Sequence, residues 1–291
     1  MSDLLRISAE VADALARGRP VVALETSIVG QGLPAPHNLR AARDCESAIR
    51  KEGTVPATIG VLDGQIVVGL TDAEVERIAN GAVKVSSRDL GHALVRNAVG
   101  ATTVAATMRA AEMAGIRCFA TGGIGGVHRG HPEDQSADLV ELGRSSVAVF
   151  CAGAKSILDL SYTLERLESL SVPVLGYGCD ELPAFYSRHS GCPVHTRVDG
   201  PEETAAVLSA AWATGSRGVV VAIPPPGELE GAEEIVQRAL RDVSDVVGPE
   251  ATPRLLARVA ELSGGRSLEL NVDLVVNNAR VAARVARVLA G

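Results

Sequence analysis

The chain has 291 residues, which is enough to bury a sizeable core. Apolar residues make up 46% of it, which excludes a disordered chain, and only 2% are aromatic, so the core must be built from aliphatic side chains. The net charge of -7 and the scarcity of aromatic stacking platforms argue against nucleic-acid binding.

The five cysteines stand at scattered spacings without a CxxC pair, which is typical of a reduced, cytoplasmic protein and does not favour a zinc site. The N-terminus lacks the basic start and apolar run of a signal peptide. No apolar stretch reaches the roughly 18 residues expected of a membrane span. We therefore expect a soluble protein without a membrane partner.

The first predicted elements are a helix and a strand. Residues 1–20 have an amphipathic helical pattern that should end at Gly18, and a buried strand follows in VVALETSIVGQGLP, from Val21. Glu25 sits where this strand runs out. An acid at the carboxyl end of a parallel strand points into the crevice where α/β proteins bind ligands. The alternative is a solvated strand-end carboxylate, but the apolar and small neighbours favour a functional role.

Residues 57–70, ATIGVLDGQIVVGL, predict a hairpin, because Asp63-Gly64 is a strong two-residue turn signal. The next helix should begin at Thr71. Beyond it, in AVKVSSRDLGHAL, Lys84 and Arg88 flank two serines. Such a group could hold a phosphate through charge and hydroxyl donors. A solvent-facing basic turn explains the same residues equally well.

The alternation continues through the second half of the chain. Strands are predicted in RCFAT, SSVAVFC, VPVLGYG and GVVVAIPPP, with helices between them, and the remainder from Gly227 is mostly helical. Helical segments of about a dozen residues between strands indicate a mostly parallel sheet with helices on both faces. Because no linker or internal repeat is present, we predict a single α/β domain over residues 1–291.

Residues 121–155 hold a dense group of unlike reactive side chains. Four glycines at positions 122–126 follow a strand, but they fit neither GxGxxG nor a P-loop. They could let backbone N–H groups approach an anion, with His128 or Arg129 adding charge or a donor. The alternative is a flexible turn.

Asp134 and Asp138 are four residues apart, a spacing that would place them on one face of a helical turn, with Ser136 between them. Two carboxylates and a hydroxyl can hold Mg²⁺ or Mn²⁺, which keep several waters. Helix capping is the competing interpretation, since Asp134 or Ser136 is a good N-cap for the segment that follows. Capping leaves one aspartate without a role.

Lys155 ends SSVAVFCAGAK, in which every neighbour is apolar or small. Burying an ammonium group is costly, so we expect a share of neutral, nucleophilic amine, as Schiff-base chemistry requires. A lysine that extends to solvent from a strand end is the alternative. The nearby aspartates and glycines favour the reactive interpretation.

Seven blocks of the sequence resemble the pseudouridine-5'-phosphate glycosidase family, also called the indigoidine synthase A-like family. The blocks run in unbroken order: LETSIVGQGLPAPHN, PATIGVLDGQIVVGL, KVSSRDL, ATGGIGGVHRG, DQSADL, VFCAGAKSILDL and LVVNNARVAARVA. Together they are far more specific than any one of them.

The resemblance implies reversible cleavage of pseudouridine 5'-phosphate to uracil and ribose 5-phosphate. The bond broken joins two carbons, so the usual scheme with two carboxylates is insufficient. The family's mechanism opens the sugar ring with help from an acid and forms a lysine-bound imine of the linear sugar. The resemblance also implies that the protein is a cytoplasmic homotrimer. Each subunit would bind one Mn²⁺, with Mg²⁺ or another divalent cation as the alternative.

Carried over by motif, the resemblance makes Glu25 the proton donor, Lys155 the covalent nucleophile and Asp134 the Mn²⁺ ligand. The implied substrate contacts are Lys84, Val104, His128, Ser136, Ala137, Asp138 and Asn278. Two other functions remain open. One is a Schiff-base lyase acting on another sugar phosphate, and the other is a sugar-phosphate-binding protein without turnover.

Overall fold

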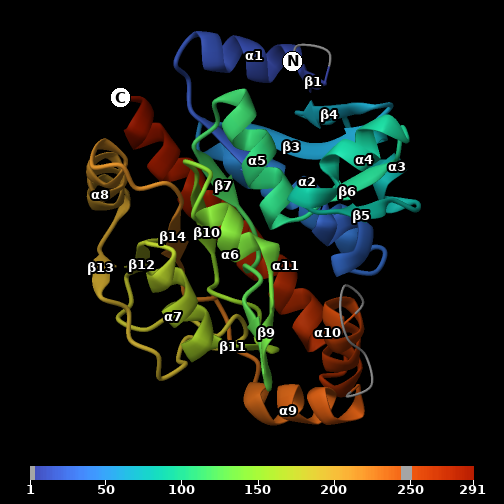
Figure 1. The fold of residues 1–291 in the computed structure, drawn as a ribbon, viewed down its shortest axis with the longest axis vertical. Coiled ribbons are helices and arrows are strands. Elements are labelled where there is room, and N and C mark those ends of the chain that lie inside the picture. Colours follow the sequence, from blue (N-terminus) through green and yellow to red (C-terminus); the bar gives the residue numbers. More distant parts are fainter. Residues whose placement is uncertain (1–3, 244–250) are drawn as a thin grey trace.

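The computed structural model describes residues 4–243 and 251–291 (Figure 1). Its strands are β1 (Leu5–Ile7), β2 (Val21–Leu24), β3 (Val55–Leu62), β4 (Gln65–Val68), β5 (Val83–Val85), β6 (Gly100–Thr102), β7 (Cys118–Ala120), β8 (Val127–His128), β9 (His131–Gln135), β10 (Ala148–Cys151), β11 (Leu158–Asp159), β12 (Val174–Tyr177), β13 (Thr196–Val198) and β14 (Val219–Ala222). Its α-helices are α1 (Ala9–Ala16), α2 (His37–Lys51), α3 (Asp72–Ala79), α4 (Leu90–Val95), α5 (Val104–Ala114), α6 (Ala137–Leu142), α7 (Leu160–Ser169), α8 (Pro201–Ala213), α9 (Ala232–Asp242), α10 (Ala251–Leu262) and α11 (Arg266–Ala290). A π-helical turn, η1 (Ile28–Gly32), and a 3₁₀ turn, η2 (Ser87–Asp89), complete the described elements.

The main sheet is mixed but mostly parallel. Its strands follow the order β1-β4-β3-β2-β7-β10-β14-β12-β13, and β6 joins β3 to β5. The central pairs from β3 through β2, β7, β10 and β14 to β12 are all parallel, while β4 and β6 pair with β3 in antiparallel fashion. Every residue of β2, β10 and β14 is buried, as expected for strands covered on both faces.

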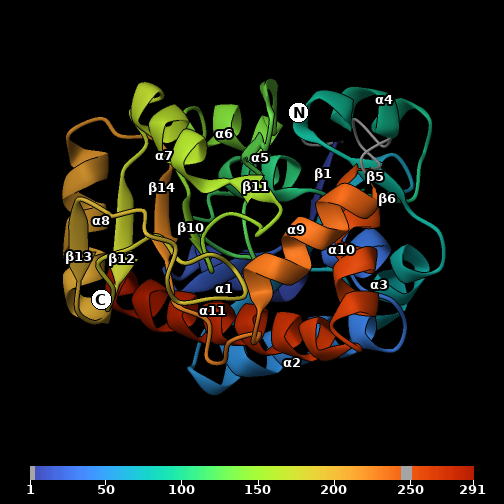
Figure 2. The same cartoon turned by 90° about the horizontal axis from the view of Figure 1, so that it is seen from below.

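Helices cover both faces of this sheet, which confirms the predicted fold class. Helices α2 and α11 lie side by side on one face, with α5 and α6 on the opposite face (Figure 2). The long helix α11 packs against β2, β7 and β10, and α5 packs against β2 and β3. None of the described helices is both long enough and apolar enough to cross a membrane.

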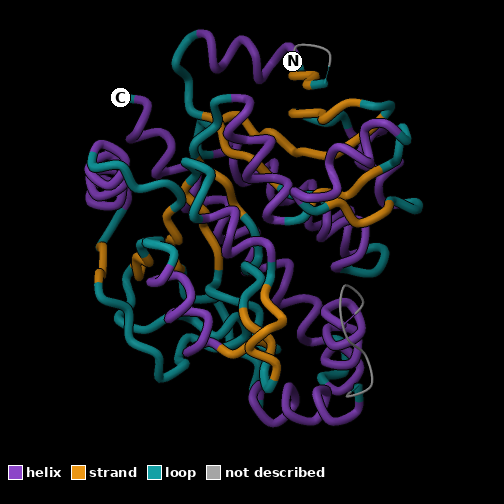
Figure 3. The backbone as a smooth tube through the Cα atoms, in the orientation of Figure 1, coloured by secondary structure: helices purple, strands orange, loops and turns teal. Residues whose placement is uncertain are grey.

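A second, small sheet lies apart from the main one. Strands β11, β8 and β9 pair in that order and are antiparallel, and they form a separate group of strands toward the bottom of the view in Figure 3. The sequence pattern did not predict this sheet, because two of its strands have only two residues each. It lies next to the cavity described below and contributes residues to it.

The N-terminal prediction was partly wrong. A strand, β1, runs parallel to β4 where a continuous helix was expected, and the helix itself covers only Ala9–Ala16. Ser8 caps that helix by accepting a hydrogen bond from the backbone N–H of Val11. Residues 1–3, where we expected the helix to begin, lie outside the described part.

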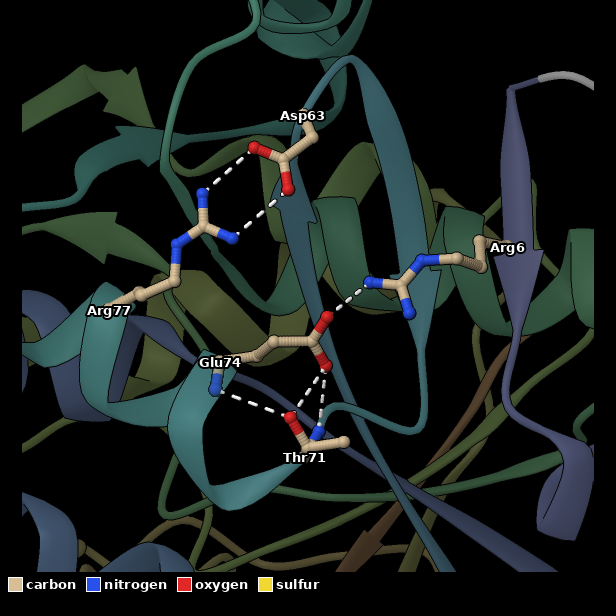
Figure 4. Close-up of polar contacts among 5 residues, drawn as sticks. All are labelled: Arg6, Asp63, Thr71, Glu74 and Arg77. Atoms are coloured by element: carbon tan, nitrogen blue, oxygen red, sulfur yellow. Dashed lines mark hydrogen bonds and ion pairs between the residues drawn. The ribbon is translucent and has the colours of Figure 1, made fainter.

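The predicted hairpin is confirmed, and Figure 4 shows how its turn is held. Asp63 and Gly64 both have positive φ angles, as a two-residue hairpin turn requires. The guanidinium of Arg77 donates two hydrogen bonds, of 3.0 and 2.8 Å, to the Asp63 carboxylate. Thr71 and Glu74 cap α3 reciprocally, and Glu74 also pairs with Arg6 from β1 (Figure 4).

Candidate active site

A cavity of about 890 Å³ collects most of the predicted site residues. Its walls come from η1, the segment from β5 to α4, the start of α5, the small sheet and its neighbouring loops, and α10. Eight predicted residues line it: Lys84, Val104, His128, Asp134, Ser136, Ala137, Asp138 and Lys155. Segments far apart in the sequence therefore meet around one space.

Glu25 and Asn278 do not line the cavity, although both were predicted to act in the site. Both are buried. The amide Nδ2 of Asn278 donates a 2.9 Å hydrogen bond to the carbonyl oxygen of Thr121, and its Oδ1 has no partner in the described part of the chain. Thr121 in turn bonds Glu25, so the three residues form a connected layer within the core.

The carboxyl group of Glu25 accepts hydrogen bonds from the hydroxyls of Ser27 and Thr121. Burial raises the pKa of Glu25 above its usual value, and the positive charge of Lys155 opposes that shift only in part. A glutamic acid in this environment keeps its proton at a higher pH than an exposed one. It can therefore serve as a proton donor.

Thr121 is a site residue that sequence reasoning missed. Strands β2 and β7 are parallel neighbours, and their register pairs Leu24 with Ala120. The residues that follow, Glu25 and Thr121, therefore leave the sheet side by side. The sequence does show that Thr121 directly follows a predicted strand. Its contact with Glu25, however, depends on β2 and β7 being neighbours in the sheet, which the sequence alone does not reveal.

Lys155 lies on a turn beyond β10 rather than at the end of the strand, which stops at Cys151. Its backbone N–H donates to the carbonyl of Ile124 at 3.1 Å, and its own carbonyl accepts the N–H of Leu158 at 3.0 Å. Its Nζ donates a 2.7 Å hydrogen bond to the carbonyl of Gly123. The side chain is half-buried and reaches the cavity, so the amine is less enclosed than we expected.

The two aspartates do not share a helical face, which corrects the prediction from their spacing. Asp134 lies in β9 and Asp138 in the first turn of α6. Ser136, between them, caps α6, with its hydroxyl accepting the N–H of Asp138 at 3.2 Å. Because the strand ends and the helix begins at Ser136, the carboxylates of Asp134 and Asp138 lie in different elements.

Asp138 is buried and joins the start of α5 to the glycine segment, residues 122–126. Its Oδ1 accepts the backbone N–H of Ala105 at 2.9 Å, and its Oδ2 accepts that of Gly125 at 2.8 Å. The amide of Gly125 is therefore occupied by a carboxylate and does not face an anion. A Cβ at Gly125 would lie 2.2 Å from Ser136 Oγ, so this glycine is required for close packing and not for flexibility.

Basic side chains gather on the opposite wall, along β5, η2 and α4. Lys84 and Arg88, predicted as a phosphate site or a solvent-facing turn, both line the cavity and are both exposed. His92 and Arg96 line it too, and sequence reasoning missed them. His92 lies on α4 and Arg96 is the C-cap residue of that helix, so the helix is needed to bring them to the same wall as Arg88. This wall suits an anionic part of a ligand.

The profile of the family described as indigoidine synthase A like protein matches residues 10–288. The chain belongs to this family. Among its curated relatives is a pseudouridine-5'-phosphate glycosidase of Nocardioides sp., 53% identical over 99% of this chain and 97% of the relative. Another, from Geobacillus kaustophilus, is 51% identical over 99% of this chain and its own whole length, 100%.

Two solved structures have the same fold as this chain. An indigoidine synthase A-like protein from Thermotoga maritima superposes with a TM-score of 0.92 at 34% identity, covering 99% of this chain and 97% of the other. The prealnumycin C-glycosynthase AlnA, in complex with ribulose 5-phosphate, superposes with a TM-score of 0.88 at 40% identity and the same coverage, 99% and 97%.

The family resemblance implies a divalent metal, and Asp134 is the residue that fits one. Its carboxylate lines the cavity and makes no hydrogen bond or ion pair with any described residue. Within the described ranges there is no group of three or more histidine, cysteine, aspartate or glutamate side chains that could hold a metal. A single carboxylate suits Mn²⁺ or Mg²⁺ that takes its other ligands from water and substrate.

Proposed function

We propose that this protein is a C-glycosidase that cleaves pseudouridine 5'-phosphate to uracil and ribose 5-phosphate, reversibly. Two relatives at 53% and 51% identity over almost the whole chain bear the name of this activity. The structural observation that carries the proposal is the buried Glu25, whose pKa is raised by burial and is acted on by the positive charge of Lys155. Lys155 lines the cavity, and Glu25 lies buried near enough for that charge to act on its pKa, which supports a proton donor and a nucleophile working together.

In the proposed mechanism Glu25 gives its proton to the ring oxygen of the ribose, and the bond between C1′ and that oxygen breaks, which opens the ring. The amine of Lys155 then forms a bond to C1′ of the sugar and gives up a proton. The bond between C1′ and the uracil ring carbon breaks as that carbon takes up a proton, and uracil leaves. Water hydrolyses the remaining imine between Lys155 and linear ribose 5-phosphate.

The other cavity residues bind and orient the substrate. Lys84 and the basic wall would hold the phosphate, which is dianionic near neutral pH. Asp134 would hold the metal, which supplies positive charge for the substrate's oxygen atoms when bound. Asp138 would hold the glycine segment, residues 122–126, against the start of α5 and so fix the shape of the part of the cavity that binds the sugar.

The decisive experiment is incubation with pseudouridine 5'-phosphate and Mn²⁺ while uracil is followed by chromatography. We expect uracil release, and condensation of uracil with ribose 5-phosphate in the reverse direction. Borohydride added during turnover should reduce the imine and leave a ribose 5-phosphate adduct on Lys155, seen by mass spectrometry.

The Lys155→Ala variant is the control, and it should fold normally, form no adduct and release no uracil. An adduct without uracil release in either direction would indicate a Schiff-base lyase for another sugar phosphate. Binding of ribose 5-phosphate with neither adduct nor turnover would indicate a binding protein.

A further inference from the structure

Arg129 does not enter the cavity, although we considered it as a charge for an anionic ligand. It directly follows β8, and only 24% of its side chain is exposed. Its Nε donates a 2.9 Å hydrogen bond to the carbonyl of Leu158, and its Nη2 donates one of 2.9 Å to the carbonyl of Ser156. The guanidinium is therefore engaged by backbone carbonyls and does not line the cavity.

Both carbonyls belong to the turn that carries Lys155. This turn, residues 155–158, is closed by the bond from the Leu158 N–H to the Lys155 carbonyl. Its far end enters β11, where Leu158 pairs with His128 of β8. Arg129, which follows the strand beside the turn, thus binds the carbonyls of two of the three turn residues after the lysine, Ser156 and Leu158.

Glu233, in the first turn of α9, holds the other side of the guanidinium. Its Oε1 accepts the Nη1 of Arg129 at 2.7 Å, and this hydrogen bond is the main cause of the lowered pKa of Glu233. Helix α9 packs on α10, which contributes residues to the cavity wall. One planar side chain therefore joins the lysine turn to α9, which packs on the cavity-lining helix α10.

We propose that Arg129, oriented by Glu233, is a positioning residue that sets the place of the Lys155 amine. The inference rests on the proposed function, in which Lys155 is the nucleophile. The lysine must come within bonding reach of one carbon atom, and a displacement of ~1 Å in such a group can cost about 100-fold in rate. A single ammonium in place of the guanidinium cannot reproduce the forked contacts with two carbonyls and a carboxylate.

The test compares Arg129→Lys with wild type in steady-state kinetics and in borohydride trapping with ribose 5-phosphate. We expect kcat and the trapping rate to fall together by about 10- to 100-fold, while KM stays within about twofold, because substrate contacts are intact. In Arg129→Ala, added guanidinium ion should restore part of kcat. Glu233→Gln, a change on an exposed side chain, should lower kcat less than either.

Arg284→Lys is the matched control, because Arg284 also pairs with a glutamate, Glu52, but lies on α11 away from the lysine turn. The kcat of the Arg284→Lys variant should equal that of wild type. A raised KM with unchanged kcat in Arg129→Lys would make Arg129 a substrate contact and overturn the proposal. So would an equal loss of kcat in Arg284→Lys, or no rescue by guanidinium.

The failure of this inference is distinct from failure of the proposed function. If wild type is trapped and Arg129→Lys is trapped at the same rate, only the role of Arg129 is refuted. If wild type itself gives no adduct, Lys155 is not the nucleophile and the role of Arg129 falls with it, whereas uracil release decides separately whether the protein is a C-glycosidase.

Discussion

The buried carboxyl of Glu25 makes the stability of the protein depend on pH. Its pKa in the folded protein is raised above 4.5 by burial. Below pH 4.5 the group is protonated in both the folded and the unfolded chain. As the pH rises, the unfolded chain loses the proton first, which favours unfolding until the folded-state pKa is passed. Glu25 therefore lowers stability at neutral and alkaline pH.

Replacing Glu25 by glutamine should remove this dependence, because an amide does not ionise. We expect the Tm of Glu25→Gln minus that of wild type to become more positive as the pH rises from about 4.5 toward 8. Thermal unfolding followed by circular dichroism across this range checks the expectation, and a difference that stays constant with pH would contradict it. Uracil release should be lost in the same variant, because the proton donor is gone.

Single residues differ in how far the sequence could identify them. Lys155 and Glu25 stand out because an ionisable group among apolar neighbours needs an explanation. Thr121 and Asn278 do not stand out, since a threonine or an asparagine is compatible with almost any position. Their contacts depend on the pairing of β2 with β7 and on the packing of α11 above them, which are long-range features.

At the scale of elements, local signals predicted the larger helices and the buried strands well. The hairpin at Asp63-Gly64 and the long helix α11 follow from turn chemistry and periodicity. The N-cap at Ser136, the alternative drawn from the sequence, is confirmed, but the strand that holds Asp134 was missed, because the spacing of two aspartates fits a helix as well as a loop. Such short elements next to the cavity depend on packing more than on propensity.

The cap of α3 provides a test of local stabilisation that leaves the cavity intact. Thr71→Ala removes the hydroxyl that accepts the Glu74 N–H, and should lower the free energy of unfolding by about 1 kcal/mol. Thr71→Ser keeps the hydroxyl and should be close to wild type. Urea denaturation measures both variants. Uracil release should be unchanged, since no α3 residue lines the cavity, and a loss of activity would contradict this separation.

At the scale of the whole molecule, metal and substrate should bind together. Because Asp134 is the single free carboxylate among the described cavity residues, we expect Mn²⁺ to bind weakly alone and more tightly with ribose 5-phosphate present. Calorimetric titration with and without the sugar phosphate tests this, with Asp134→Ala as the control. Equal Mn²⁺ affinity in both titrations would contradict shared coordination.

Turnover should also depend on the metal. A chelator should abolish turnover and Mn²⁺ should restore it.

The assembly expected from the family resemblance is a homotrimer. Val83 and Val95, beside the basic wall, are 56% and 82% exposed, and an interface between subunits would cover such apolar side chains. Sedimentation equilibrium should give a mass three times that of the 30.1 kDa chain. A monomer at micromolar concentration would contradict the expectation.

Helix α11 has a consequence for the order in which the protein can be built on a ribosome. It covers β2, β7 and β10, and its Asn278 supports Thr121, the partner of Glu25. Glu25 and Thr121 are thus translated more than 100 residues before the helix that completes their surroundings. The layer of residues around Glu25 cannot form until nearly the whole chain has been translated. Nascent fragments that lack α11 should therefore release no uracil.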